Sequence, residues 1–273
     1  MVNNLRFSLN RARAPVNRLP PELLSRIFTY LPTPRIPPRP HQPEGVWRAS
    51  IASLATINLV CQYWRQTAVG TKKLWTHIVA VTALGSESLR LILDLFLERS
   101  GSYPLSLSIL QAEKSGRGSD ALDAMEPHFH RLRTLHIDDS WIGTPLLRFF
   151  SQQHAPLLEE FKIERPPEFG KLPRVFGSST PRLRTLDFVG CVPWRGNRFR
   201  DLSTLALGLV EIESLNHLLL MLQDSPRLEH LCLHRCLFHT CVTPLRYLSK
   251  CITSKRSLCH NSRSRKSPYC TSL

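Results

Sequence analysis

The chain has 273 residues, 42% of them hydrophobic, and a formal net charge of +15, so it can form a packed core and is not disordered throughout. The charge lies at the two ends: residues 1–48 carry +6 and residues 230–273 carry +8, whereas residues 49–229 carry +1. A nearly neutral middle lacks the basic stripe of a nucleic-acid-binding domain, so we expect this class only as an alternative, with basic ends that attract acidic partners without specificity.

The compartment is inferred from what the sequence lacks. It contains no run of about 18 apolar residues and begins without a secretory hydrophobic segment. We therefore expect a soluble protein of the cytoplasm, the nucleus or both, with its eight cysteines mostly reduced. A transit peptide is the alternative for residues 1–21, which are rich in arginine and contain no acidic residue.

A short amphipathic helix is predicted between Leu19 and Pro32, after a basic extension at residues 1–17. Pro20 and Pro21 suit the first turn, where a missing N–H costs nothing, and Pro32 ends the helix. One apolar stripe combines Leu23, Leu24, Ile27, Phe28 and Leu31. A proline-rich insert follows at residues 32–50.

A second helix is predicted from about Ser50 to Ala68. Its apolar residues recur at steps of three and four, as on one helix face: Leu54, Ile57, Cys61, Trp64 and Ala68. Leu74 and Trp75 follow as apolar anchors, and residues 77–81 read as an apolar strand or turn.

These landmarks, in this order, resemble an F-box over residues 18–80. The resemblance implies a three-helix module that binds a Skp-type adaptor and thereby joins a cullin-based ubiquitin ligase. It implies adaptor-binding roles for Leu19, Pro20, Leu23, Leu24, Ile27 and Val60, while Trp64 and Trp75 would pack the module. The alternative is that these residues are only the core of a capping helix pair.

Internal repeats fill the chain after the module. Five segments, starting at residues 130, 156, 181, 200 and 226, align as L-x-x-L-x-L with Phe and Ile as variants. Their central apolar residues, at positions 135, 161, 186, 205 and 231, lie 26, 25, 19 and 26 residues apart, and leucine-rich repeats have periods of about 20–29 residues. In such repeats Cys191 and Cys236 would bond the turn backbone.

Helical patterns occupy the intervals between the repeats. Residues 144–150 and 215–222 each carry one, and residues 86–97 precede an alternating strand at 104–109, whereas the short interval at 192–200 leaves room only for a turn. The sequence thus resembles a fungal-type F-box protein with an irregular leucine-rich-repeat region at residues 81–249. The implied fold class is α+β or an α/β solenoid behind a small helical module.

Strand alternation predicts which side chains face a partner. The central apolar residues of each strand point inward, so their neighbours form a polar, concave face. His136, Lys162, Asp187, Ala206 and Cys232 would form one row across it. The candidate target-binding residues are His136, Asp138, Glu160, Lys162, Asp187, His230, Cys232 and His234. Mixed charge favours a protein or peptide ligand; a solvated face without a ligand is the alternative.

Metal and enzyme chemistry are disfavoured by the motifs. His230, Cys232, His234, Cys236, His239 and Cys241 crowd together, but structural zinc favours paired ligands on two arms, so we expect no metal. No phosphate-binding glycine loop, nucleophile elbow or H-E-x-x-H motif occurs, so we expect neither an enzyme nor a cofactor.

Residues 250–273 read as a basic, Ser/Arg-rich disordered tail. The expected function, by resemblance, is the substrate-recognition subunit of a Skp–cullin–F-box ubiquitin ligase that binds its target through the repeats and is a monomer outside the complex. A leucine-rich-repeat scaffold without a ubiquitin role and a basic nucleic-acid-associated protein are the alternatives.

Overall fold

The computed structural model describes residues 14–31, 53–81, 86–110, 120–138, 150–164, 174–178, 180–193, 197–212 and 215–238. Within these ranges no helix is both long and apolar enough to cross a membrane. Several predicted features lie outside the described residues: the N-terminal extension up to residue 13, the insert at 32–50, the start of the helix at 144–150, and everything from residue 239 onward, including His239, Cys241 and the tail.

Short helices form the N-terminal part of the structure. They are η1 (Pro15–Arg18), α2 (Pro21–Phe28), the helical residues 53–60, α4 (Gln62–Gly70) and η2 (Lys72–Trp75). The predicted first helix is confirmed as α2, with Pro21 in its first turn, but it ends at Phe28 and not at Pro32 as predicted. The predicted single helix at 50–68 is wrong, because Cys61 adopts an extended conformation (φ −161°, ψ 171°) that separates residues 53–60 from α4.

The break at Cys61 has a physical reason in the contacts that α4 makes. Trp64 Nε1 donates a hydrogen bond of 2.8 Å to Asn17 Oδ1, and the Tyr63 hydroxyl donates one to the Leu19 carbonyl. The carbonyl of Asn58, near the end of the preceding helix, accepts a bond of 2.8 Å from Arg65 Nε. These bonds orient α4 toward the segment before α2, and periodicity alone cannot reveal such tertiary bonds.

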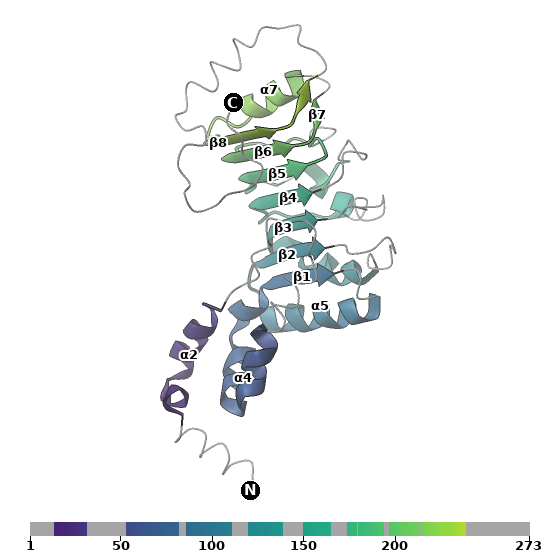
Figure 1. Cartoon of the computed structure of the whole chain (residues 1–273). Helices are drawn as coiled ribbons and strands as arrows, with labels where there is room; N and C mark the ends of the chain where they lie inside the picture. The colour runs from purple at the N-terminus through teal and green to yellow at the C-terminus, as the bar shows by residue number, and fades with distance from the viewer. Residues whose placement is uncertain are drawn as a thin grey trace.

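Seven parallel strands form one sheet, in which every strand pairs with its neighbours in chain order. They are β1 (His77–Val81), β2 (Leu105–Leu110), β3 (Leu132–Asp138), β4 (Glu160–Glu164), β5 (Thr185–Val189), β6 (Thr204–Gly208) and β8 (His230–His234). The five predicted L-x-x-L-x-L segments are β3, β4, β5, β6 and β8. Figure 1 shows the strands stacked in order, with the N-terminal helices at the β1 end. Helices and a parallel sheet place the chain in the predicted α+β class.

The core lies on one face of this sheet. Leu135 and Ile137, Phe161 and Ile163, Leu186 and Phe188, and Leu205 and Leu207 are all at most 1% exposed. Helix α5 (Ser86–Ser100) packs against η2, β1 and η4 (Asp120–Arg131), and α7 (Leu215–Gln223) precedes β8. Both helices follow the predicted patterns, and the predicted turn at 192–200 has no helix in its described residues. The remaining described elements are η6 (Phe176–Ser178), between β4 and β5 in the chain, and a two-stranded sheet formed by β7 (Glu211–Ile212) and β9 (Leu237–Phe238).

The same turn follows three of the strands. Gly190, Leu209 and Arg235, each directly after its strand, have φ values of 76°, 52° and 50°. The N–H of Gly190 donates to Gly208 O at 2.8 Å, and that of Leu209 donates to His234 O at 2.9 Å. At the other end, Thr185, Thr204 and His230 each donate to a carbonyl just before the preceding strand in the sheet. Successive units therefore share one backbone geometry.

The helical module and the sheet share apolar contacts. Leu54 and Leu74 pack against both the small cluster of Leu24, Phe28, Ile57 and Ala68 and the main core. Strand β1 pairs along its whole length with β2. The predicted boundary between residues 80 and 81 consequently falls inside a strand, and no separate linker joins the module to the sheet.

Candidate functional site

The outer face of the sheet, opposite the core, carries the predicted polar row. Strand register aligns His136, Lys162, Asp187, Ala206 and Cys232 as successive partners across β3, β4, β5, β6 and β8. Rows on either side contain Glu160 and His230, and Asp138 and His234. The eight predicted target-binding residues therefore share one face, as the alignment of repeats predicted.

An ion-pair network occupies the middle of the outer face. Lys162 Nζ lies 2.7 Å from Glu164 Oε1 and 3.5 Å from Asp187 Oδ2. Burial opposes the charge of Lys162, but the two carboxylates outweigh it and raise the pKa of this lysine. Burial also raises the pKa of Asp187, and Lys162 acts against that rise. Strand alternation also predicted Glu164 on this face, two positions after Lys162, although it is not among the eight candidate target-binding residues.

His136 is far less accessible than a target-binding residue was expected to be. The residue is only 8% exposed, and it lies between Ser108 and Lys162 in its row. Burial, followed by Lys162, lowers its pKa to about 4, although Glu164 acts in the opposite direction. The neutral ring has Nε2 3.8 Å from Glu164 Oε1, and neither ring nitrogen has a hydrogen-bond partner within the described part of the chain.

The histidine and cysteine side chains of β8 do not form a metal centre in the described structure. His230 is exposed, whereas Cys232 and His234 are half-buried. Cys236 Sγ donates to the carbonyls of Leu207 and His234, at 3.5 and 3.8 Å. This bonding is the predicted turn role of the cysteine. Residues 14–238, where described, contain no group of three or more potential metal ligands.

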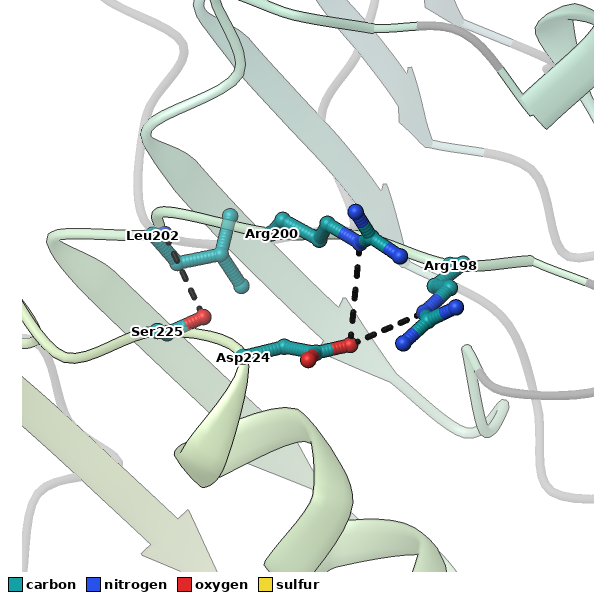
Figure 2. A network of polar contacts seen from close by, with 5 residues as sticks. All are labelled: Arg198, Arg200, Leu202, Asp224 and Ser225. Atoms are coloured by element: carbon teal, nitrogen blue, oxygen red, sulfur yellow. Dashed lines mark hydrogen bonds and ion pairs between the residues drawn. The ribbon is translucent and has the colours of Figure 1, made fainter.

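A polar network lies near the N-terminal ends of β6 and β8. Asp224 Oδ2 lies 3.0 Å from Arg198 Nε and 3.8 Å from Arg200 Nε (Figure 2). Ser225 Oγ accepts a hydrogen bond of 3.3 Å from the Leu202 N–H. These contacts hold the segment before β6 against the end of α7, so we assign them to positioning of the strands.

Helix α2 divides its apolar stripe between the core and solvent. Leu24 and Phe28 are 0% and 2% exposed, and the Phe28 ring lies 5.1 Å from that of Trp64. Leu23 and Ile27 are 49% and 47% exposed. One side of the apolar stripe therefore packs in the core of the module, and the other side is exposed to solvent.

Further apolar side chains of the module are exposed. They are Val16, Tyr30, Leu31, Leu59 and Val60, with Leu59 and Tyr30 both at 75%. A group of exposed apolar residues on a small module is typical of a protein-interaction site. Leu59 and Tyr30 were missed from the sequence, although Leu59 lies off the apolar stripe of its helix and so signals a second apolar side.

Residues 16–80 match the F-box-like family model. The match covers the module from η1 to β1 and confirms the predicted F-box-like domain. No curated protein and no solved structure matches the chain. F-box domains typically bind Skp-type adaptors.

The F-box-like module places the predicted adaptor residues unequally. Pro20, Leu23, Ile27 and Val60 are exposed, and Leu19 is half-buried. Leu24 requires a correction, because it is fully buried against the module's own core and offers no side-chain surface for docking.

The two tryptophans also differ in position. Trp64 is half-buried beside Phe28 within the F-box-like module. Trp75 belongs to the main core, where its ring lies 5.3 Å from that of Phe96 and 4.3 Å below Arg99 Cζ. Trp75 therefore packs the junction between module and sheet rather than the module alone.

Proposed function

We propose that this chain is the substrate-recognition subunit of a Skp–cullin–F-box ubiquitin ligase of the cytoplasm or nucleus. The F-box-like module binds the adaptor, and the outer face of the sheet binds the target protein. The exposure of Leu23, Ile27 and Val60, within a module that matches the F-box-like family, carries the proposal. The chain acts by holding the target near a ubiquitin-conjugating enzyme, so its contribution is proximity.

We further propose that the sheet is an irregular leucine-rich-repeat solenoid. Parallel strands that pair in chain order, separated by about one repeat period, support this reading. The shared left-handed turn residue after β5, β6 and β8 supports it as well, as does the bond from Cys236 Sγ to the Leu207 carbonyl. In such a solenoid the binding surface is the face predicted above to be polar and concave, which is the outer face of the sheet opposite the core.

Co-expression with a Skp-type adaptor tests the ligase role. Ile27→Asp places a charge on the exposed side of α2, and Leu91→Asp makes the same kind of change at a 66%-exposed leucine of α5. We expect the wild-type chain and Leu91→Asp to retain the adaptor through size-exclusion chromatography, and Ile27→Asp to lose it. Thermal unfolding of the variants should stay close to wild type, because neither site is in the core.

Two results would contradict the ligase role. One is the absence of a complex between the wild-type chain and the adaptor. The other is equal adaptor retention by Ile27→Asp and Leu91→Asp, which would show that α2 is not the docking surface.

An interaction scaffold without a ubiquitin role is the second candidate. One observation favours it: the F-box-like family match ends at residue 80 and does not extend over the strands that carry the polar face. A scaffold would bind its target through the same face and fail to retain the adaptor, which the co-expression experiment distinguishes.

A further inference from the structure

The outer face of β3, β4 and β5 is acidic in a strongly basic chain. Asp138, Glu160, Glu164 and Asp187 lie on this face, and Lys162 is its one cationic residue among the aligned positions of these strands. The whole chain carries +15. A face of opposite sign to its protein favours a cationic ligand, because complementary potentials select the partner and exclude acidic ones.

His136 supplies an independent sign of a ligand. Its ring is buried, next to Glu164, and neither of its nitrogens has a hydrogen-bond partner in the described residues. A buried polar group without a partner costs stability, whereas an apolar side chain of similar size would fit the same position without that cost. Both ring nitrogens are covered in this structure, so a bound group would have to displace the side chains over the ring to hydrogen bond to it, and such a bond would remove the cost.

The accessible carboxylates suit a guanidinium or ammonium group. The side chains of Asp187 and Glu164 are 33% and 26% exposed, so a ligand can reach them. The contact from Lys162 to Asp187, at 3.5 Å, is longer than its contact to Glu164, at 2.7 Å. Arginine is the side chain best matched to a carboxylate, because its fork donates two parallel hydrogen bonds.

We propose that the outer face of β3, β4 and β5 binds an extended segment of the target protein that carries arginine or lysine, with Asp187 and Glu164 as its anionic contacts and His136 as a hydrogen-bonding residue. The polar rows run across several strands about 4.8 Å apart, which suits an extended chain lying over them. This inference rests on the proposed function, since it names the chemistry of the target segment.

Fluorescence anisotropy with defined peptides tests the charge. The probes are a labelled Gly/Ser peptide containing several arginines and two matched peptides with glutamine or glutamate in their place. We expect the full-length protein to bind the arginine peptide, more weakly as salt is raised, and to bind the other two poorly. Equal binding of the arginine and glutamine peptides would overturn the proposal.

A matched pair of variants locates the site. Asp187→Asn removes one charge from the outer face, and Asp94→Asn removes one charge from α5, where Asp94 is paired with Arg90. We expect Asp187→Asn to lower affinity for the arginine peptide about tenfold, the loss typical of a charge-assisted bond, and Asp94→Asn to leave it unchanged. Equal losses would indicate non-specific attraction and refute the site.

His136→Leu distinguishes a binding role from a structural one. If His136 is kept for its ligand, the variant should unfold at the same temperature as wild type or a higher one, yet bind the arginine peptide about tenfold more weakly. A lower unfolding temperature with unchanged affinity would assign His136 to the fold and remove it from the proposal.

The same preparations separate this inference from the ligase role. Adaptor retention without arginine-peptide binding would refute only the acidic face, and peptide binding without adaptor retention would refute only the ligase role. Residues 241–273 contain seven Lys and Arg and no acidic residue. If replacing those seven with Gln raised peptide affinity markedly, the chain's own C-terminal segment would be the occupant, and the assignment to a target protein would be overturned.

Discussion

Trp75 offers a quantitative test of how the F-box-like module is joined to the sheet. The residue is 3% exposed, contacts Phe96 and Arg99, and donates a hydrogen bond of 2.9 Å from Nε1 to the Ala68 carbonyl. Trp75→Ala removes the whole ring from the core, which costs about 3–5 kcal/mol. This value already contains the aromatic and cation–π contacts.

Trp75→Phe separates packing from hydrogen bonding. Phenylalanine keeps most of the apolar contact but cannot donate to Ala68. That carbonyl also accepts the Thr71 N–H at 3.2 Å, so it stays bonded, and the loss should be about 1 kcal/mol.

Urea unfolding followed by circular dichroism measures the free energy of unfolding of both variants. We expect one cooperative transition and a difference of about 2–4 kcal/mol between the two variants. Equal losses would refute the assignment of the stability to ring packing. Separate transitions for module and sheet in the wild-type protein would refute the shared core.

Three further predictions concern single residues. The pKa of His136 falls from 6.5 to about 4 on folding, because the folded protein favours the neutral ring. The stability that this shift contributes is complete above pH 6.5 and is lost as the pH falls toward 4, so the free energy of unfolding should drop by about 3 kcal/mol over that range. A His136→Leu variant should lack this part of the drop when urea unfolding is measured at a series of pH values. Gly190 has a φ of 76°, which is unfavourable for a residue with a Cβ, so Gly190→Ala should destabilise the protein by at least about 1 kcal/mol. Leu209 has a φ of 52°, so Leu209→Gly should stabilise it by up to about 1 kcal/mol. Thermal unfolding of the two variants checks both signs. Leu24→Ala should cost about 2–5 kcal/mol and Ile27→Asp less than about 0.5 kcal/mol, and equal effects in urea would contradict the division of α2 into a buried and an exposed side.

The sheet could be predicted in detail because its repeats carry their own register. Aligning the L-x-x-L-x-L segments determines which residues are neighbours, so the row from His136 through Lys162 and Asp187 to Cys232 follows from the sequence alone. Alternation then fixed which side faces the core. Both inferences depend on local pattern, and parallel pairing in chain order preserves local pattern.

The errors occur where tertiary contacts decide. Periodicity continues through Cys61, but bonds from Tyr63 and Trp64 to the segment before α2 reorient the chain there. Leu24 and Leu23 are adjacent apolar residues of one stripe, and only the position of Ile57 and Ala68 shows that Leu24 is the buried one. The burial of His136 likewise depends on its neighbours across the sheet and not on its own segment.

The shared core bears on how an adaptor and a target would be held together. A flexible linker between two binding modules leaves their separation to be averaged over many conformations. Here β1 ends the family match and also begins the seven-stranded sheet, and Leu74 contacts the cores on both sides. A target bound on β3, β4 and β5 would therefore keep one orientation relative to the adaptor surface of α2. In the proposed ligase role, where the chain contributes proximity, this fixed orientation would help a lysine of the target to reach an enzyme carried by other subunits.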